Sequence, residues 1–256
     1  MPVKLQIKYG ILVSITVIAV VAVVINGSIP QDASYDAFAD TRSMLMLPNF
    51  WNVFSNLPFL LIGLAGILFL MFGNSKNTPP LFINCLVFFV GIFFTGIGSA
   101  YYHYFPSNCT LVWDRLPMTI SFMSFFSIII GEYICLRSAK RILFPLIFIG
   151  IMSIIYWQMT ESKGYGDLRF YVLVQFLPIV LIPIIMLLFQ SQQKVSGYFW
   201  LMILSYGFAK LFEANDHLVF NEFQLLSGHT IKHIFAAFTP TIFLVMLWKK
   251  NAINDF

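Results

Sequence analysis

The chain has 256 residues, of which 59% are hydrophobic and only 10% are charged, and its mean hydropathy is +0.83. Soluble domains usually carry about 25% charged residues, so this composition excludes an ordinary soluble domain and predicts an all-α, polytopic membrane protein. The net charge of +4 comes mostly from lysines and arginines in short loops. We therefore expect no nucleic-acid partner.

The first apolar run, about residues 10–26, follows two lysines and precedes a polar, acidic segment. This pattern is typical of a signal peptide or a signal anchor. Residues 26–30 make a poor small-x-small cleavage site, which favours a retained signal anchor. We accordingly divide the chain into an N-terminal anchor with its outer linker, residues 1–34, and a membrane domain, residues 35–250.

Seven further apolar runs each approach the roughly 20 residues that a membrane-spanning helix needs. They cover about 51–73, 80–103, 111–136, 142–159, 170–189, 197–217 and 229–248. The sequence therefore predicts a seven-transmembrane-helix bundle plus the N-terminal apolar helix. The three cysteines have no zinc-ligand spacing and are odd in number, so we expect no disulfide framework.

The loop charges predict the orientation of the bundle in the membrane. If the runs alternate in direction, one side collects nine basic residues: Lys4, Lys8, Lys76, Arg137, Lys140, Arg141, Lys194, Lys249 and Lys250. The other side collects three, namely Arg42, Lys163 and Arg169. By the positive-inside rule, both termini are cytoplasmic and the segment 27–50 is outside.

Four ionisable residues then reach the same outer level of the membrane. His103 ends one run, Asp114 opens the next, and His229 and His233 open the last. Ionisable groups inside a bilayer are expensive and indicate a functional site by default. The alternative is a set of unrelated interfacial histidines, but agreement in depth among three runs favours a single site.

Helical spacing supports that single site. His229 and His233 are four residues apart and share a helix face, as do Ser99 and His103. Three histidines with a nearby carboxylate match an open, catalytic zinc site. We expect His103, His229 and His233 to bind zinc, Asp114 to hold and deprotonate a water, and Ser99 to donate to the oxyanion that forms on a carbonyl.

These residues resemble the alkaline ceramidases. The similarity lies in Ser-x-x-x-His, an Asp eleven residues after that His, and His-x-x-x-His in the last helix, together with Asn49-Phe50-Trp51-Asn52 near the first core helix. It covers about residues 35–248, and the stretch 227–233 is more similar to the bacterial branch. The resemblance implies a seven-helix bundle in a bacterial inner membrane, with the zinc and catalytic roles just given.

The resemblance also implies a function, the hydrolysis of the amide bond of an N-acyl lipid such as ceramide to a long-chain base and a fatty acid. The apolar bundle itself indicates a lipid substrate that stays within the membrane. Three alternatives remain open: a receptor-like member of the superfamily with a structural zinc, a hydrolase of another lipid, and a transporter or plain scaffold, which the three-histidine pattern disfavours. The oligomeric state is not predicted.

The acidic segment before the first core helix departs from the family pattern. Eukaryotic members bind calcium there, through a string that ends in a Glu where this chain has Asn49. Asp36 and Asp40 are the remaining candidate calcium ligands, with Asn49, but they do not repeat the family's string. The sequence favours a solvated acidic loop over a calcium site.

Three further polar residues carry two interpretations each. Lys232 stands between the two histidines where eukaryotic members have an aromatic residue, and it could contact a substrate head group or extend to the interface. Glu213 and His217 lie one helical turn apart, with Lys210 three residues before Glu213. They form either a structural ion-pair network or, with Asp216, a set of partners that orients a ligand histidine.

Overall fold

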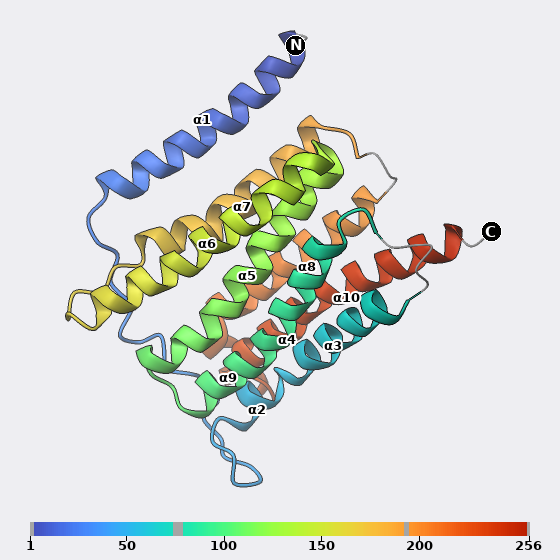
Figure 1. Ribbon diagram of the computed structural model, residues 1–256. Coiled ribbons are helices and arrows are strands. Elements are labelled where there is room, and N and C mark those ends of the chain that lie inside the picture. Colours follow the sequence, from blue (N-terminus) through green and yellow to red (C-terminus); the bar gives the residue numbers. More distant parts are fainter. Residues whose placement is uncertain (1–2, 74–78, 192–194, 255–256) are drawn as a thin grey trace.

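The computed structural model describes residues 3–73, 79–191 and 195–254, and it is an all-α bundle (Figure 1). The long helices run roughly parallel or antiparallel to one another. In chain order the elements are α1 (Val3–Ile25), α2 (Phe50–Phe54), α3 (Leu57–Phe72), α4 (Phe82–Tyr104), α5 (Asn108–Tyr133), α6 (Leu136–Glu161), α7 (Arg169–Leu188), α8 (Ser196–Ala214), α9 (Asp216–Phe223) and α10 (Gly228–Asn254).

The expectation of a multi-pass membrane protein is confirmed. Within the described residues, seven helical segments are long and apolar enough to cross a membrane: α1, α2 with α3, α4, α5, α6, α7 and α10. Helix α8 is outside this set because Lys210 and Glu213 lower its hydropathy, yet it packs along α10 as the remaining long helix of the bundle. Helix α1 lies at the edge of the bundle against α7, where the rings of Tyr9 and Phe189 are 5.6 Å apart.

Several boundaries differ from those expected. The run 51–73 divides into α2 and α3, and Pro58, which lacks a backbone N–H, stands in the first turn of α3, a position that suits proline. The run 197–217 ends at Ala214, and a short helix, α9, follows it. Helix α6 begins at Leu136, so three of the basic residues that were assigned to a loop lie in its first two turns.

The helices alternate in direction, so α4, α6 and α8 end at the same end of the bundle at which α5, α7 and α10 begin (Figure 1). We call this the site end, because it holds the ends of α4, α5 and α10 that carry the candidate residues. The segment 26–49 also lies there. Lys76 and Lys194, which contributed to the charge bias, lie outside the described residues.

Helices α4 and α5 approach each other closely near the candidate site. A Cβ atom on Gly98 would collide with the backbone carbonyl of Trp113, so only glycine fits. Small residues permit this kind of close backbone approach between membrane helices. The contact places Ser99, the next residue of α4, opposite Asp114, the next residue of α5.

Two apolar clusters hold the bundle together. The larger lies away from the site end and contains aromatic side chains in edge-to-face or tilted contact, including Phe88, Phe125, Phe199 and Phe243. The smaller lies at the site end and includes Phe38, Tyr102, Leu111, Trp157 and Tyr171. Large apolar side chains elsewhere, such as Phe144 and Phe148 on α6, are exposed on the outside of the bundle, where a bilayer would cover them.

Candidate metal centre and adjoining cavity

Three buried histidines meet at the site end. His103 comes from the last turn of α4, and His229 and His233 come from the first two turns of α10. Their ring centroids are 4.7 to 4.9 Å apart in each pair, and one nitrogen from each ring lies within 4.8 Å of the others. This group could hold a metal ion, which agrees with the clustering that the sequence predicted.

The geometry of the histidines fits a transition metal. The Nε2 atoms of His103 and His229 are 3.2 Å apart, close to the roughly 3.3 Å that separates two nitrogens bound tetrahedrally to one zinc ion. Buried imidazoles that face one another need a shared proton or a shared cation to satisfy their nitrogens. Nδ1 of His103 is also buried and has no partner in the described structure.

Polar residues of α2 fix the start of α10. The Asn52 side-chain oxygen accepts a hydrogen bond from Thr230 Oγ1 at 3.0 Å, and its amide donates to the carbonyl of Asp40 at 3.1 Å. Ser55 Oγ lies 2.7 Å from Nδ1 of His233. A partner on this nitrogen fixes the orientation of the ring, so that Nε2 is left for a metal.

The N-terminus of α10 is anchored by two further side chains. Ser227 Oγ accepts a hydrogen bond from the backbone N–H of Thr230, a typical cap. Asp216 Oδ1 accepts one from the backbone N–H of His229 at 2.7 Å. Asp216 therefore holds the backbone that carries His229.

The segment that precedes α2 covers the histidines. The ring of Phe38 packs on His103 and His229, with centroids 4.8 and 5.0 Å away. Asp216 Oδ2 accepts a hydrogen bond from the backbone N–H of Ala39 at 3.0 Å. The histidine group is therefore closed toward the site end, and a reactant would have to approach from within the bundle.

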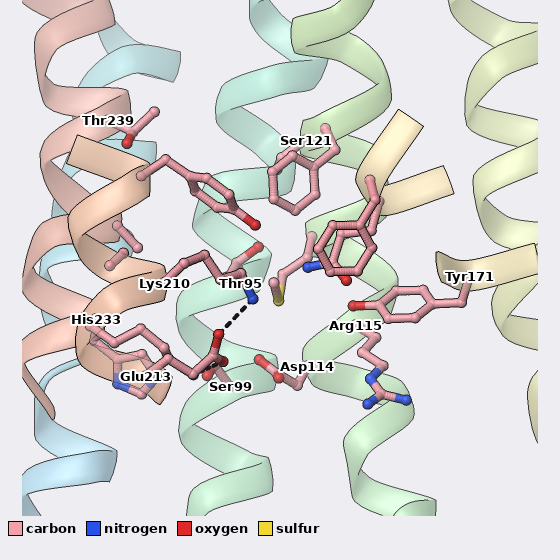
Figure 2. Close-up of a pocket in the computed structure, with 18 of the residues that line it drawn as sticks. Thr95, Ser99, Asp114, Arg115, Ser121, Tyr171, Lys210, Glu213, His233 and Thr239 are labelled. Atoms are coloured by element: carbon pink, nitrogen blue, oxygen red, sulfur yellow. Dashed lines mark hydrogen bonds and ion pairs between the residues drawn. The ribbon is translucent and has the colours of Figure 1, made fainter. Parts of the chain in front are cut away.

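A cavity of about 390 Å³ provides that approach (Figure 2). His233, a member of the histidine group, and Lys232 line it. Its apolar lining residues include Phe59, Phe88, Ile92, Phe125, Phe176 and Pro240. A cavity of this size, mostly apolar with a few polar groups, is typical of a small-molecule or lipid site. His103 and His229 are not among the residues that line it.

Asp114 and Ser99 both line this cavity, as does His233. Both side chains are buried, with 8% and 3% of their surface exposed. Figure 2 shows the two side chains on neighbouring helices, α5 and α4, with Glu213 and His233 nearby. The structure thus brings together a carboxylate, a hydroxyl and the histidine group at one polar part of an otherwise apolar cavity.

A charged network adjoins the histidines. Glu213 pairs with Lys210 at 2.6 Å and with Lys232 at 3.1 Å. Lys232 Nζ also lies 3.0 Å from Nε2 of His229, so its ammonium must give way if that nitrogen binds a metal. Lys232 lines the cavity, whereas His217 is exposed and its Nε2 lies 3.0 Å from the carbonyl of Ala37.

The candidate calcium ligands each have another partner. The Tyr102 hydroxyl donates to Asp36, and Arg42 donates to both carboxylate oxygens of Asp40. The amide of Asn49 donates to the carbonyl of His103 at 2.9 Å. In the described part of the chain, the histidine group is the only set of three potential metal-binding side chains that meets closely.

Sequence reasoning missed several residues around the site, namely Phe38, Asn52, Ser55 and Arg115. Asn52, Ser55 and Asn56 were detectable, because three polar residues at the start of an apolar run need buried partners. Phe38 carried no such signal, since it lies in the long linker between α1 and α2, outside any apolar run.

A comparison of the sequence with protein-family models and with curated proteins finds no match.

Proposed function

We propose that the protein is a zinc-dependent intramembrane amidase that hydrolyses the amide bond of an N-acyl lipid, of the ceramide type, to a long-chain base and a free fatty acid. One observation carries the proposal: a three-histidine group, a carboxylate and a hydroxyl adjoin the same apolar cavity. A structural metal site needs only the histidines.

Zinc bound by His103, His229 and His233 would supply Lewis acidity, which lowers the pKa of a water and polarises a carbonyl. Asp114 would hold the attacking water and accept its proton. Ser99 would donate a hydrogen bond to the oxyanion that forms on the amide carbonyl. The acyl chain would lie among the phenylalanines of the cavity, which exclude bulk water.

The main alternative is a receptor-like protein in which zinc is structural. The position of Asp114 and Ser99 on the cavity wall favours the hydrolase, because a closed structural site leaves no reactant position to serve. We further propose that the site end faces the non-cytoplasmic side of a bacterial inner membrane, on the basis of the loop charges. The lipid would then enter from the outer leaflet.

The test is turnover by the purified protein on a panel of N-acyl lipids, with and without a chelator, analysed by mass spectrometry. Release of fatty acid that the chelator abolishes and added zinc restores would support the amidase. Wild-type protein that retains one zinc per chain but releases no fatty acid from any member of the panel would favour the receptor-like alternative.

A further inference from the structure

The cavity has a second polar feature, the guanidinium of Arg115. Arg115 follows Asp114 on α5, is only 4% exposed and lines the cavity. Three aromatic rings surround it, with its Cζ 4.6 Å from the centroid of Trp157, 4.8 Å from Tyr171 and 5.2 Å from Tyr35. Such rings stabilise a cation but provide no hydrogen-bond acceptor in the plane of the guanidinium.

Most of the guanidinium nitrogens of Arg115 have no hydrogen-bond partner in the described residues. Its Nη2 donates to Gln31 Oε1 at 2.8 Å, whereas Nε and Nη1 are buried without a partner. No carboxylate in the described residues lies within ion-pair distance of Arg115: the neighbouring Asp114 interacts with it only at longer range, Glu213 pairs with the two lysines, and the exposed Asp32 accepts from Ser34. A buried charge without a partner is costly, and arginine is always protonated.

We propose that Arg115 binds an anionic group, a phosphate or carboxylate, in the polar head of the lipid substrate. The proposal rests on the proposed amidase function and specifies its substrate class. Oxyanions of this type accept two hydrogen bonds from a guanidinium, which would satisfy its free nitrogens. The charge of the ligand would also balance the buried cation.

The position of Arg115 fits a head group. Figure 2 shows its side chain extending from α5 past Asp114 in the direction that leads along α4 from Thr95 to Ser99, which is toward the site end. Pro30, Gln31 and Tyr35 cover this part of the cavity. Phe88 on α4 and Phe125 on α5 also line the cavity, and each lies ten or more residues farther from the site end than Ser99 and Arg115 on the same helices. A lipid could therefore place its anionic group at Arg115, its amide beside Asp114 and Ser99, and its acyl chain in the apolar part.

The first test compares N-acyl lipids with the same acyl chain and either a neutral or an anionic head group. We expect wild-type protein to prefer the anionic lipid. Arg115→Gln should lower kcat/KM for the anionic lipid about ten- to a hundred-fold more than for the neutral lipid, the usual effect of losing a hydrogen bond to a charged group. Lys163→Gln, which removes an exposed charge at the same end, is the matched control. Equal loss on both lipids, or no preference in wild type, would overturn the proposal.

A second test needs no turnover and so separates this proposal from the amidase function. Thermal unfolding is measured in one detergent with dodecyl phosphate, dodecanol or sodium phosphate. We expect dodecyl phosphate to raise Tm more than the other two, and Arg115→Gln to abolish the difference. An equal effect of dodecanol, a shift that persists in Arg115→Gln, or an equal effect of sodium phosphate would each contradict an anionic lipid site. If dodecyl phosphate binds through Arg115 while no lipid is hydrolysed, the amidase function alone fails.

Discussion

The hydroxyl of Ser55 lies 2.7 Å from Nδ1 of His233, and this contact joins the end of α2 to the histidine group through α10. Residues that orient a metal-binding histidine typically contribute ten- to a hundred-fold to metal affinity. We therefore expect Ser55→Ala to weaken zinc binding by roughly that factor. Competition with a chelating dye measures it. Unchanged affinity would mean that the hydroxyl does not orient His233.

Ser99→Ala should lower kcat on an N-acyl lipid about a hundred- to a thousand-fold, because one oxyanion donor usually contributes that much. Zinc content should stay at the wild-type level, since Ser99 is not one of the three histidines. The control is Ser121→Ala, which removes a hydroxyl from the same cavity about 10 Å farther along α5 from Asp114. A similar loss in both variants would argue against a specific role for Ser99.

Much of the site followed from the sequence, because helical spacing fixes which residues share a face. His229 and His233 stand four residues apart, and alternating helices bring His103 and Asp114 to the same end. The rest depends on long-range packing. The cover formed by Phe38 and the orphaned nitrogens of Arg115 depend on where a long linker folds back, and no local periodicity encodes that path.

Charged residues at the start of a helix account for one of the differences in the fold. Expected boundaries followed apolar runs, so the basic first turns of α6 were assigned to a loop. The polar residues of α8 lower its hydropathy, yet it remains a bundle helix because Glu213 and its two lysines satisfy one another. A hydropathy average does not register such a partly buried ion-pair network.

The carboxyl of Asp167, in the loop between α6 and α7, should make the stability of the protein depend on pH. Burial raises the pKa of Asp167, but hydrogen bonds from Arg169, Tyr156 and the Ile29 backbone outweigh burial and lower that pKa to about 2, from an ordinary 3.8. Because the folded pKa is the lower one, the stabilisation is present above pH 3.8 and is lost as the pH falls toward 2.

Wild-type protein should thus lose more thermal stability between pH 4 and about 2 than Asp167→Asn, which has no carboxyl to protonate. Above pH 5 the variant should be the less stable of the two. Thermal unfolding across this range measures both differences. Parallel curves for the two proteins would show that the ion pair with Arg169 contributes nothing measurable.

Native and introduced cysteines test the proposed orientation. Cys109 is exposed at the site end, and Ser138 is exposed at the opposite end. In intact cells, a variant that keeps only Cys109 should react with a membrane-impermeant thiol reagent, whereas Ser138→Cys in a cysteine-free background should react only after permeabilisation. The reverse pattern would place the histidine group on the cytoplasmic side and leave its proposed chemistry unchanged.

The most direct test of the amidase function compares Asp114→Asn with wild type, by measuring fatty acid release and zinc content on the same samples. The amide has nearly the size of the carboxylate but cannot accept a proton from the attacking water. We predict one zinc per chain in both proteins, fatty acid release by wild type, and loss of at least about a hundred-fold of that rate in the variant. Equal rates in the two proteins at equal zinc content would contradict the account.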